Sequence, residues 1–249
     1  YFAYVIGVHY NPEKIVNEAL FINWFTSAYS DEELRKNKDK KKIKISPLQG
    51  KPDLARLLYT YYRGVFKGSK ELYNNNLEYL DEKLFLLEMR DEKYLNLEEK
   101  KAIYQICVEF TNYAKSKKLL DDNDYALKVV HQAEYGLKRT EYIIIDEVQD
   151  LTEIELIATI LTLKEDSQKI YFYGDPHQSI NPNVFDHSTI NKVYSTLKND
   201  SLVVSDSLSI TYRTNKLLIN YLNQLLEYRD KWIAHTKGGL NRIIEPPIT

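Results

Sequence analysis

Two short, uninterrupted apolar runs stand out in the pattern of hydrophobic and polar positions along the chain. Tyr142–Ile145 is rich in β-branched residues, and residues 169–173 form a second run. Such runs are typical of strands that are buried on both faces of a parallel sheet. Between them, residues 152–155 form a capping box, and apolar side chains recur at helical spacing after it. The pattern therefore predicts a strand, a helix and a second strand that is parallel to the first.

Helical periodicity dominates the part of the chain that precedes these strands. Residues 53–66 carry an apolar stripe, and residues 72–137 are predicted to form three or four further helices. Nearer the start, residues 1–9 are predicted to form a short strand, and Pro12 is predicted to open a helix. A lysine-rich run at residues 35–44 is interpreted as a solvated loop, with phosphate binding as the alternative.

Composition narrows the class of protein only moderately. Hydrophobic residues make up 43% of the 249 residues, which supports a packed core. The net charge of −2 does not by itself indicate a nucleic-acid binder. The single cysteine, Cys107, excludes an internal disulfide and fits a reducing, cytoplasmic location. No apolar run approaches the ~18 residues of a membrane span. The chain begins at Tyr1 rather than Met, so we expect a fragment of a longer protein.

Two carboxylates follow the first predicted strand directly. Asp146 and Glu147 stand where that strand ends, and open α/β sheets bind ligands beyond the carboxyl ends of their strands. A magnesium–nucleotide site would use Asp146 to hold Mg²⁺, and Glu147 to orient and deprotonate a water molecule. The same residues could also form an ordinary acidic turn before a helix, and this motif alone does not separate the two possibilities.

Two further motifs follow in a recognisable order. Residues 146–150 read DEVQD, residues 174–180 read GDPHQSI after the second predicted strand, and residues 209–215 read SITYRTN before a predicted helix. This order resembles superfamily 1 helicases of the UvrD/Rep type, in which the three stretches are motifs II, III and IV. The resemblance extends from about residue 142 to residue 226, and three ordered motifs are more specific than any one of them.

The resemblance implies a role for each matching residue. Asp146 would hold Mg²⁺ and Glu147 would be the catalytic base of ATP hydrolysis. Gln178 would sense the γ-phosphate of ATP. Tyr212 would stack on the adenine, and Arg213 would act as an arginine finger that stabilises charge on the transferring phosphoryl group. Gln149 and Asp150 would connect the site to the neighbouring motifs.

The chain departs from the family pattern at two places. Residues 181–183 read NPN where the family usually has aromatic residues that stack on DNA, so Phe185 is the nearest candidate for that contact. No phosphate-binding loop occurs, because residues 64–70 have neither its spacing nor a preceding strand. The chain would therefore carry only part of an ATP site, and we expect it to be inactive as an ATP hydrolase on its own.

The predicted fold class is α/β, with a RecA-like parallel sheet of the P-loop NTPase type and a large all-helical insertion. Residues 1–52 would form an N-terminal strand, a helix and a basic loop, and residues 53–138 the helical insertion. Residues 139–200 would form the RecA-like core with motifs II and III, and residues 201–249 would carry motif IV and start a second RecA-like domain.

The resemblance implies a central fragment of an ATP-dependent helicase that moves on single-stranded DNA. Its cofactors would be ATP and Mg²⁺. Its partners would be single-stranded DNA and the remaining helicase domains of the same protein, with no membrane involved. The alternative is a degenerate, non-catalytic helicase-like module that acts as an interaction or DNA-binding scaffold.

Overall fold

In the computed structural model, the chain divides into two units, Tyr1–Leu202 and Val203–Thr249. The structure describes residues 1–7, 9–30, 48, 53–133, 137–174 and 187–198, and residues 220, 221, 223–225, 227, 228 and 231. The described residues of the second unit are helical, and the architecture below is that of the first unit.

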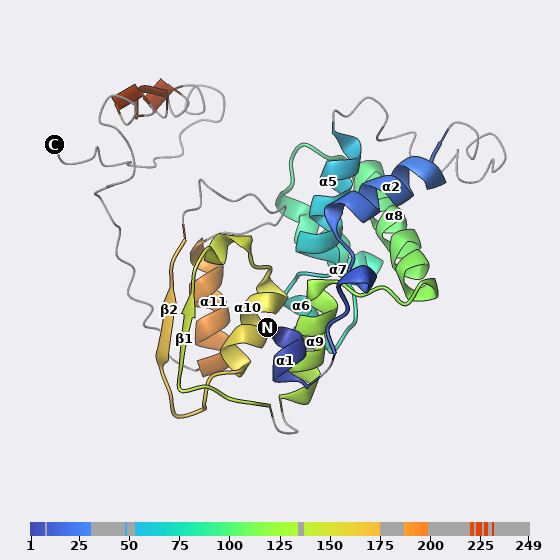
Figure 1. The fold of residues 1–249 in the computed structure, drawn as a ribbon. Coiled ribbons are helices and arrows are strands. Elements are labelled where there is room, and N and C mark those ends of the chain that lie inside the picture. The colour runs from blue at the N-terminus through green and yellow to red at the C-terminus, as the bar shows by residue number, and fades with distance from the viewer. Residues whose placement is uncertain are drawn as a thin grey trace. The chain divides into compact units, whose positions relative to one another are not determined.

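The described part of the first unit is mostly helical, with one small parallel sheet (Figure 1). Its elements, in chain order, are α1 (Phe2–Val5), a 3₁₀ turn (Pro12–Lys14), α2 (Glu18–Ala28), α5 (Leu54–Tyr61), a π-helix (Tyr62–Phe66), α6 (Glu71–Asn75), α7 (Glu82–Glu88), a 3₁₀ turn (Met89–Asp91), α8 (Leu97–Ser116), α9 (Asp122–Gln132), β1 (Tyr142–Ile145), a 3₁₀ turn (Val148–Asp150), α10 (Glu153–Leu161), β2 (Lys169–Phe172) and α11 (His187–Lys198).

The predicted strand–helix–strand unit is confirmed. β1 and β2 are parallel neighbours, with Tyr142 opposite Lys169 and Ile145 opposite Phe172. α10 connects them and begins with the predicted capping box, in which the Thr152 side chain accepts from the backbone N–H of Glu155. The carboxyl ends of both strands therefore lie at the same edge of the sheet.

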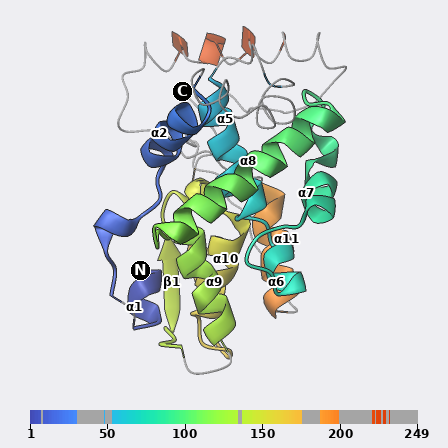
Figure 2. The same ribbon diagram turned by 90° about the vertical axis from the view of Figure 1, so that its right-hand side faces the viewer.

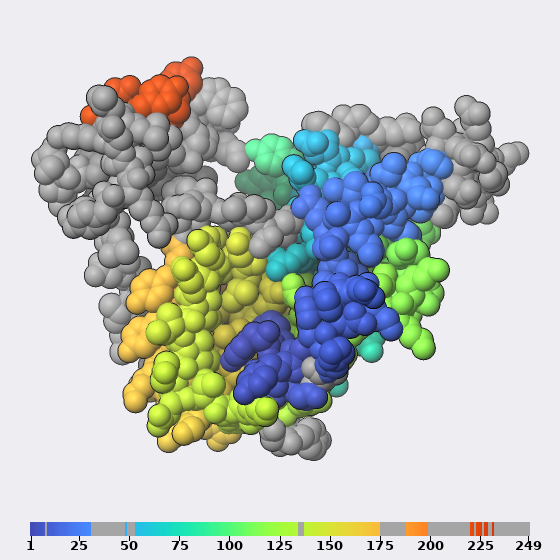
Figure 3. All heavy atoms as spheres, viewed as in Figure 1, coloured from blue at the N-terminus to red at the C-terminus, as the bar shows by residue number. Residues whose placement is uncertain are grey.

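The sheet is buried on one face rather than on both, which corrects the prediction from the apolar runs. Ile143 is only 8% exposed, whereas Tyr142 and Ile144 are 64% and 63% exposed. Tyr171 of β2 is likewise 52% exposed, and the atoms of the two strands lie open at the surface in Figure 3. α10 and α11 pack together on one side of the strands (Figure 1), and successive side chains of a strand point to opposite faces. An apolar run therefore does not by itself show that both faces are covered.

The prediction for the start of the chain is wrong in two respects. Residues 2–5 form the short helix α1 instead of a strand, because Ala3 and Val5 are buried where α1 packs against α9. Pro12 opens only a 3₁₀ turn, and α2 begins later, at Glu18. Helix α2 begins later because of a tertiary contact. The backbone N–H of Val16 donates to the carbonyl oxygen of Leu120 at 2.8 Å, which keeps the residues just before α2 extended.

The predicted helices of the central segment are confirmed, and they enclose an aromatic core. Phe21 of α2 meets Phe110 of α8 with ring centroids 4.6 Å apart, and Tyr62 of the π-helix meets Phe110 at 4.9 Å. All three side chains are at most 1% exposed. Such edge-to-face pairs stabilise a core beyond the area they bury.

α9, the last helix of this segment, packs against α10 next to the sheet (Figure 2). The predicted domain boundaries at residues 52, 138 and 200 stay predictions. Within the described residues, no helix is long and apolar enough to cross a membrane.

Candidate active site

The two predicted carboxylates lie where β1 ends. Asp146 and Glu147 are both exposed, and the backbone N–H of Glu147 donates to Asp146 Oδ1 at 3.0 Å. Gly174 follows the end of the parallel strand β2, so the first residues of both sequence motifs meet at one edge of the sheet. That is the edge at which open α/β sheets bind their ligands.

Glu147 has a backbone conformation that costs energy. Its φ and ψ of 54° and 43° are left-handed, which costs a non-glycine residue about 1–2 kcal/mol. It directly precedes the 3₁₀ turn Val148–Asp150, and the backbone N–H of Asp150 donates to its carbonyl oxygen at 2.9 Å. Asp53, Asn76 and Lys118 share this left-handed backbone elsewhere in the described chain, so the strain at Glu147 supports a functional role only together with the position of its carboxylate at the sheet edge.

A buried amide fixes the carboxylate of Glu147. Gln149 is 1% exposed, and its Nε2 donates to Glu147 Oε2 at 2.6 Å. The other side of this amide faces β2: a Cβ added at Gly174 would lie 2.3 Å from Gln149 Oε1. The backbone N–H of Val148 also donates to the carbonyl oxygen of Tyr173 at 2.9 Å. Gln149 belongs to the acidic loop, residues 146–150, and its side chain fills the space between Glu147 and the end of β2. Gly174 leaves room for this side chain.

Replacing Gly174 by Ala should destabilise the chain by about 1–3 kcal/mol, because the added methyl group overlaps a buried side chain. The expected test is a double-mutant cycle in urea unfolding, with Gly174→Ala, Gln149→Ala and both together. Removing the amide relieves the closest contact, although Val148 Cγ1 still lies 2.9 Å from the added Cβ, so the double variant should lose less stability than the sum of the single variants. Strict additivity would contradict this account of the glycine.

The donor set at this edge fits a magnesium ion that is bound together with a nucleotide. Mg²⁺ is usually held by one or two carboxylates, with phosphate oxygens and water completing its shell, and Asp146 offers one such carboxylate, with Glu147 beside it. Among the described residues, no group of three or more His, Cys, Asp or Glu side chains could hold a metal ion on its own. An exposed carboxylate leaves the other coordination positions of the ion open to phosphate oxygens and water.

The remaining predicted site residues, Gln178, Phe185, Tyr212 and Arg213, lie outside the described residues, as does the basic run at 35–44. The structure therefore brings together Asp146, Glu147, Gln149 and Gly174 of the first two motifs. The role of Gly174 is visible only in the structure, although a glycine next to a strand is a signal for close backbone approach.

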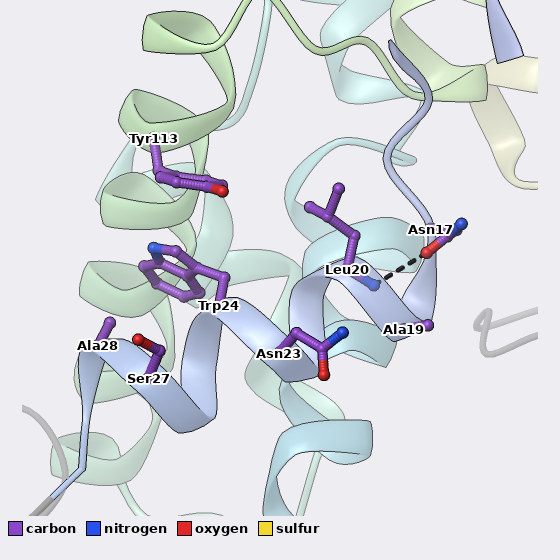
Figure 4. Close-up of a pocket in the computed structure, with 8 residues that line it drawn as sticks. All are labelled: Asn17, Ala19, Leu20, Asn23, Trp24, Ser27, Ala28 and Tyr113. Atoms are coloured by element: carbon purple, nitrogen blue, oxygen red, sulfur yellow. Dashed lines mark hydrogen bonds between the residues drawn. The ribbon is translucent and has the colours of Figure 1, made fainter. Parts of the chain in front are cut away.

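An open groove of about 520 Å³ lies elsewhere, between α2 and α8 (Figure 4). The side chain of Trp24 stands between α2 and Tyr113 of α8, and the two ring centroids are 6.1 Å apart. The groove shares no residue with the acidic loop, so it does not belong to the candidate active site.

Comparison with known proteins gives one family. The UvrD/REP helicase N-terminal domain matches residues 11–201, which is more than half of the chain and includes residues 146–150 and 174–180. No curated protein and no solved structure matches significantly.

Proposed function

We propose that this chain, which belongs to the family of UvrD/REP helicase N-terminal domains, supplies the magnesium-binding and water-activating half of an ATP site. The protein would use ATP hydrolysis to move on single-stranded DNA. The observation that carries the proposal is the pair of exposed carboxylates at the carboxyl end of β1, of which Glu147 is held by Gln149.

In this proposal, each carboxylate has its own role. Asp146 holds Mg²⁺, which neutralises charge on the phosphates of ATP. Glu147 takes the proton from the attacking water, and its hydrogen bond from Gln149 keeps Oε2 in place while leaving Oε1 to accept the proton. The left-handed backbone at Glu147 turns the chain sharply after the strand, so two adjacent residues present their carboxylates at the sheet edge.

The finer assignments rest on the family resemblance. Gln178 would sense the γ-phosphate, Tyr212 would stack on adenine, and Arg213 would act as the arginine finger. Phe185 would stack on DNA. β1 and β2 would belong to a larger RecA-like sheet, and the remaining helicase domains would complete the ATP site. A cytoplasmic location is part of the same proposal.

The Mg²⁺ dependence of nucleotide binding tests the two carboxylate roles separately. In the full-length protein encoded by the gene, Asp146→Asn should remove the stimulation of binding of a fluorescent ATP analogue by Mg²⁺, because a neutral amide is a poor ligand for this cation. Glu147→Gln should retain that stimulation. Glu141→Gln is the matched control, since Glu141 is an exposed residue just before the opposite end of β1. If the Mg²⁺ dependence of binding is the same in Asp146→Asn as in the wild type, Asp146 is not the Mg²⁺ ligand.

Phosphate release, measured with and without a single-stranded oligonucleotide, separates the two candidate functions when the full-length protein is assayed beside residues 1–249 alone. From residues 1–249 alone we expect no release above background, because much of the positioning of the phosphates comes from a phosphate-binding loop. DNA-stimulated release by the full-length protein supports the helicase proposal. Salt-dependent DNA binding without nucleotide binding by that protein would instead favour the non-catalytic scaffold.

A further inference from the structure

The π-helix and the turn after it, residues 62–70, pack closely against the start of α10. The backbone N–H of Ile154 donates to the carbonyl oxygen of Gly68 at 2.9 Å. The backbone N–H of Lys70 donates to Glu153 Oε2 at 2.8 Å. A Cβ added at Gly68 would lie 2.9 Å from the Cβ of Thr152. This segment, which lies between α5 and α6, is thus fixed to the helix that directly follows the acidic loop.

Arg63 extends this contact to the acidic loop itself. Its Nη2 donates to the carbonyl oxygen of Asp150 at 3.3 Å and to both carboxylate oxygens of Glu155, at 3.2 and 3.0 Å. The side chains of Arg63 and Glu155 are 13% and 3% exposed. The Nη1 atom of Arg63 is buried and has no hydrogen-bond partner in the described part of the chain. A buried cation of this kind is held mainly by the contacts that Nη2 makes.

α9 joins the same contact through Asn123, which is 1% exposed. Its Nδ2 donates to the carbonyl oxygen of Arg63 at 3.0 Å, and its Oδ1 accepts from Thr152 Oγ1 at 2.6 Å. The carboxylate of Glu155 accepts from the backbone N–H of Thr152 at 2.7 Å. The π-helix, α9 and α10 therefore meet at one buried polar cluster, formed by Arg63, Asn123, Thr152 and Glu155.

The acidic loop, residues 146–150, is consequently held from two sides. At one end, the backbone N–H of Val148 donates to the carbonyl oxygen of Tyr173 next to β2. At the other end, Asp150 accepts from Arg63, and its own backbone N–H donates to the carbonyl oxygen of Glu147. The first contact comes from the sheet, and the second comes from the helical part of the chain.

We infer that Arg63 is a positioning residue for the candidate active site, which fixes the C-terminal end of the acidic loop and thereby the orientation of Glu147. This inference rests on the proposed function for its consequence in catalysis, but not for its effect on the loop. A displacement of the π-helix or of α9 relative to α10 would move the Asp150 carbonyl, and this would change the orientation of Glu147. Arg63 in this way connects the helical segment to the proposed site of ATP hydrolysis.

Amide hydrogen exchange, measured by NMR on residues 1–249, tests the inference. Removing Arg63 alone leaves the Glu155 carboxylate buried without its cation, so the test variant is the double substitution Arg63→Met with Glu155→Gln. The glutamine can still accept from the backbone of Thr152. Glu155→Gln alone is the matched control, because it retains the contact from Arg63 to Asp150. Lys70→Met is a second control, since it removes a cation from the same segment without a contact to the acidic loop.

In the double variant, the backbone amides of Asp150 and Leu151 should exchange at least about tenfold faster than in either control, the effect of losing one charge-assisted hydrogen bond. Amides within α10 should exchange as in the controls. Equal exchange at Asp150 and Leu151 in all three variants would overturn the inference. An equal increase along the whole of α10 would overturn it too, because it would show general loosening.

Steady-state kinetics of the full-length protein then separate this inference from the proposed function. The double variant should lower kcat for ATP while leaving KM close to that of Glu155→Gln, because Arg63 contacts Asp150, at the end of the loop away from the proposed Mg²⁺ ligand Asp146. A rise in KM without any change in kcat would contradict the positioning role. If the wild-type protein releases no phosphate, the proposed function fails, and the exchange rates alone still decide whether Arg63 holds the loop.

Discussion

Lys67→Met should lower the free energy of unfolding by about 3–5 kcal/mol near neutral pH, the usual effect of removing one partner from a buried ion pair. Lys67 is 4% exposed, and its Nζ pairs with Asp121 at 3.2 Å and also with Asp124. Asp121 and Asp124 form the capping box of α9, and Tyr62 Oη donates to Asp121 Oδ2 at 3.3 Å. Without the ammonium group, two carboxylates remain buried beside each other with no cation.

This loss should depend on pH in a defined direction. Burial and the neighbouring Asp121 carboxylate raise the pKa of Asp124 to about 6. A carboxyl group whose pKa is raised on folding stabilises the fold below its unfolded pKa, and that contribution disappears as the pH rises through about 6. Lys67 opposes this rise, so its removal should raise the pKa of Asp124 further. The destabilisation of Lys67→Met should therefore be smallest near pH 5 and should increase towards pH 8.

Urea unfolding of the wild type and the variant across this pH range measures the effect. Lys70→Met is the matched control, because Lys70 lies three residues away with a partly exposed side chain at 4.0 Å from Glu153. A long, partly exposed pair of this kind contributes at most about 1 kcal/mol. A loss that is the same at both ends of the pH range would contradict the role given to the buried carboxylates.

Glu147→Gln should lower the rate of phosphate release by the full-length protein by about 10²–10⁴-fold, the usual contribution of a general base. The amide cannot take a proton from water at neutral pH. It can still accept the hydrogen bond that Gln149 Nε2 now donates to Glu147 Oε2, so the loop should keep its shape. Binding of Mg²⁺ and ATP should be retained, because Asp146 is unchanged.

The measurement is single-turnover phosphate release, with binding of a fluorescent ATP analogue measured in parallel. Glu141→Gln changes the same type of residue just before the other end of β1, and it should leave both quantities unchanged. The side chain of Glu141 lies 3.8 Å from Lys164 in an exposed ion pair, which contributes little to stability. Turnover by Glu147→Gln at the wild-type rate would remove this residue as the base.

The candidate site could be predicted from the sequence where its signals are local. Asp146 and Glu147 follow directly after an apolar run, and a strand end followed by carboxylates is recognisable without a structure. The conformation of Glu147 could not be predicted, because a left-handed φ is rare for glutamate and is held here by surrounding contacts. The close approach of Gln149 to Gly174 could not be predicted either, because it depends on how the 3₁₀ turn after β1 packs against the residues after β2.

The position of Arg63 is a second feature that the sequence alone could not predict. In the sequence it is one charged residue in an apolar, tyrosine-rich helix, and nothing nearby distinguishes it from a solvated arginine. Its partners, Asp150 and Glu155, lie 87 and 92 residues further along the chain. A contact over that distance depends on how the π-helix packs against α10, which no local pattern records.

The sequence by itself determined the parallel strand–helix–strand unit and the family, because apolar runs, the capping box at Thr152 and the ordered motifs are properties of neighbouring residues. Tertiary structure decided which faces and contacts those elements use. Residues 2–5 became a helix because α9 offered a surface for Ala3 and Val5, although their pattern also suits a strand. β1 is covered on one face only, because coverage depends on which elements pack against it and not on the strand's own residues.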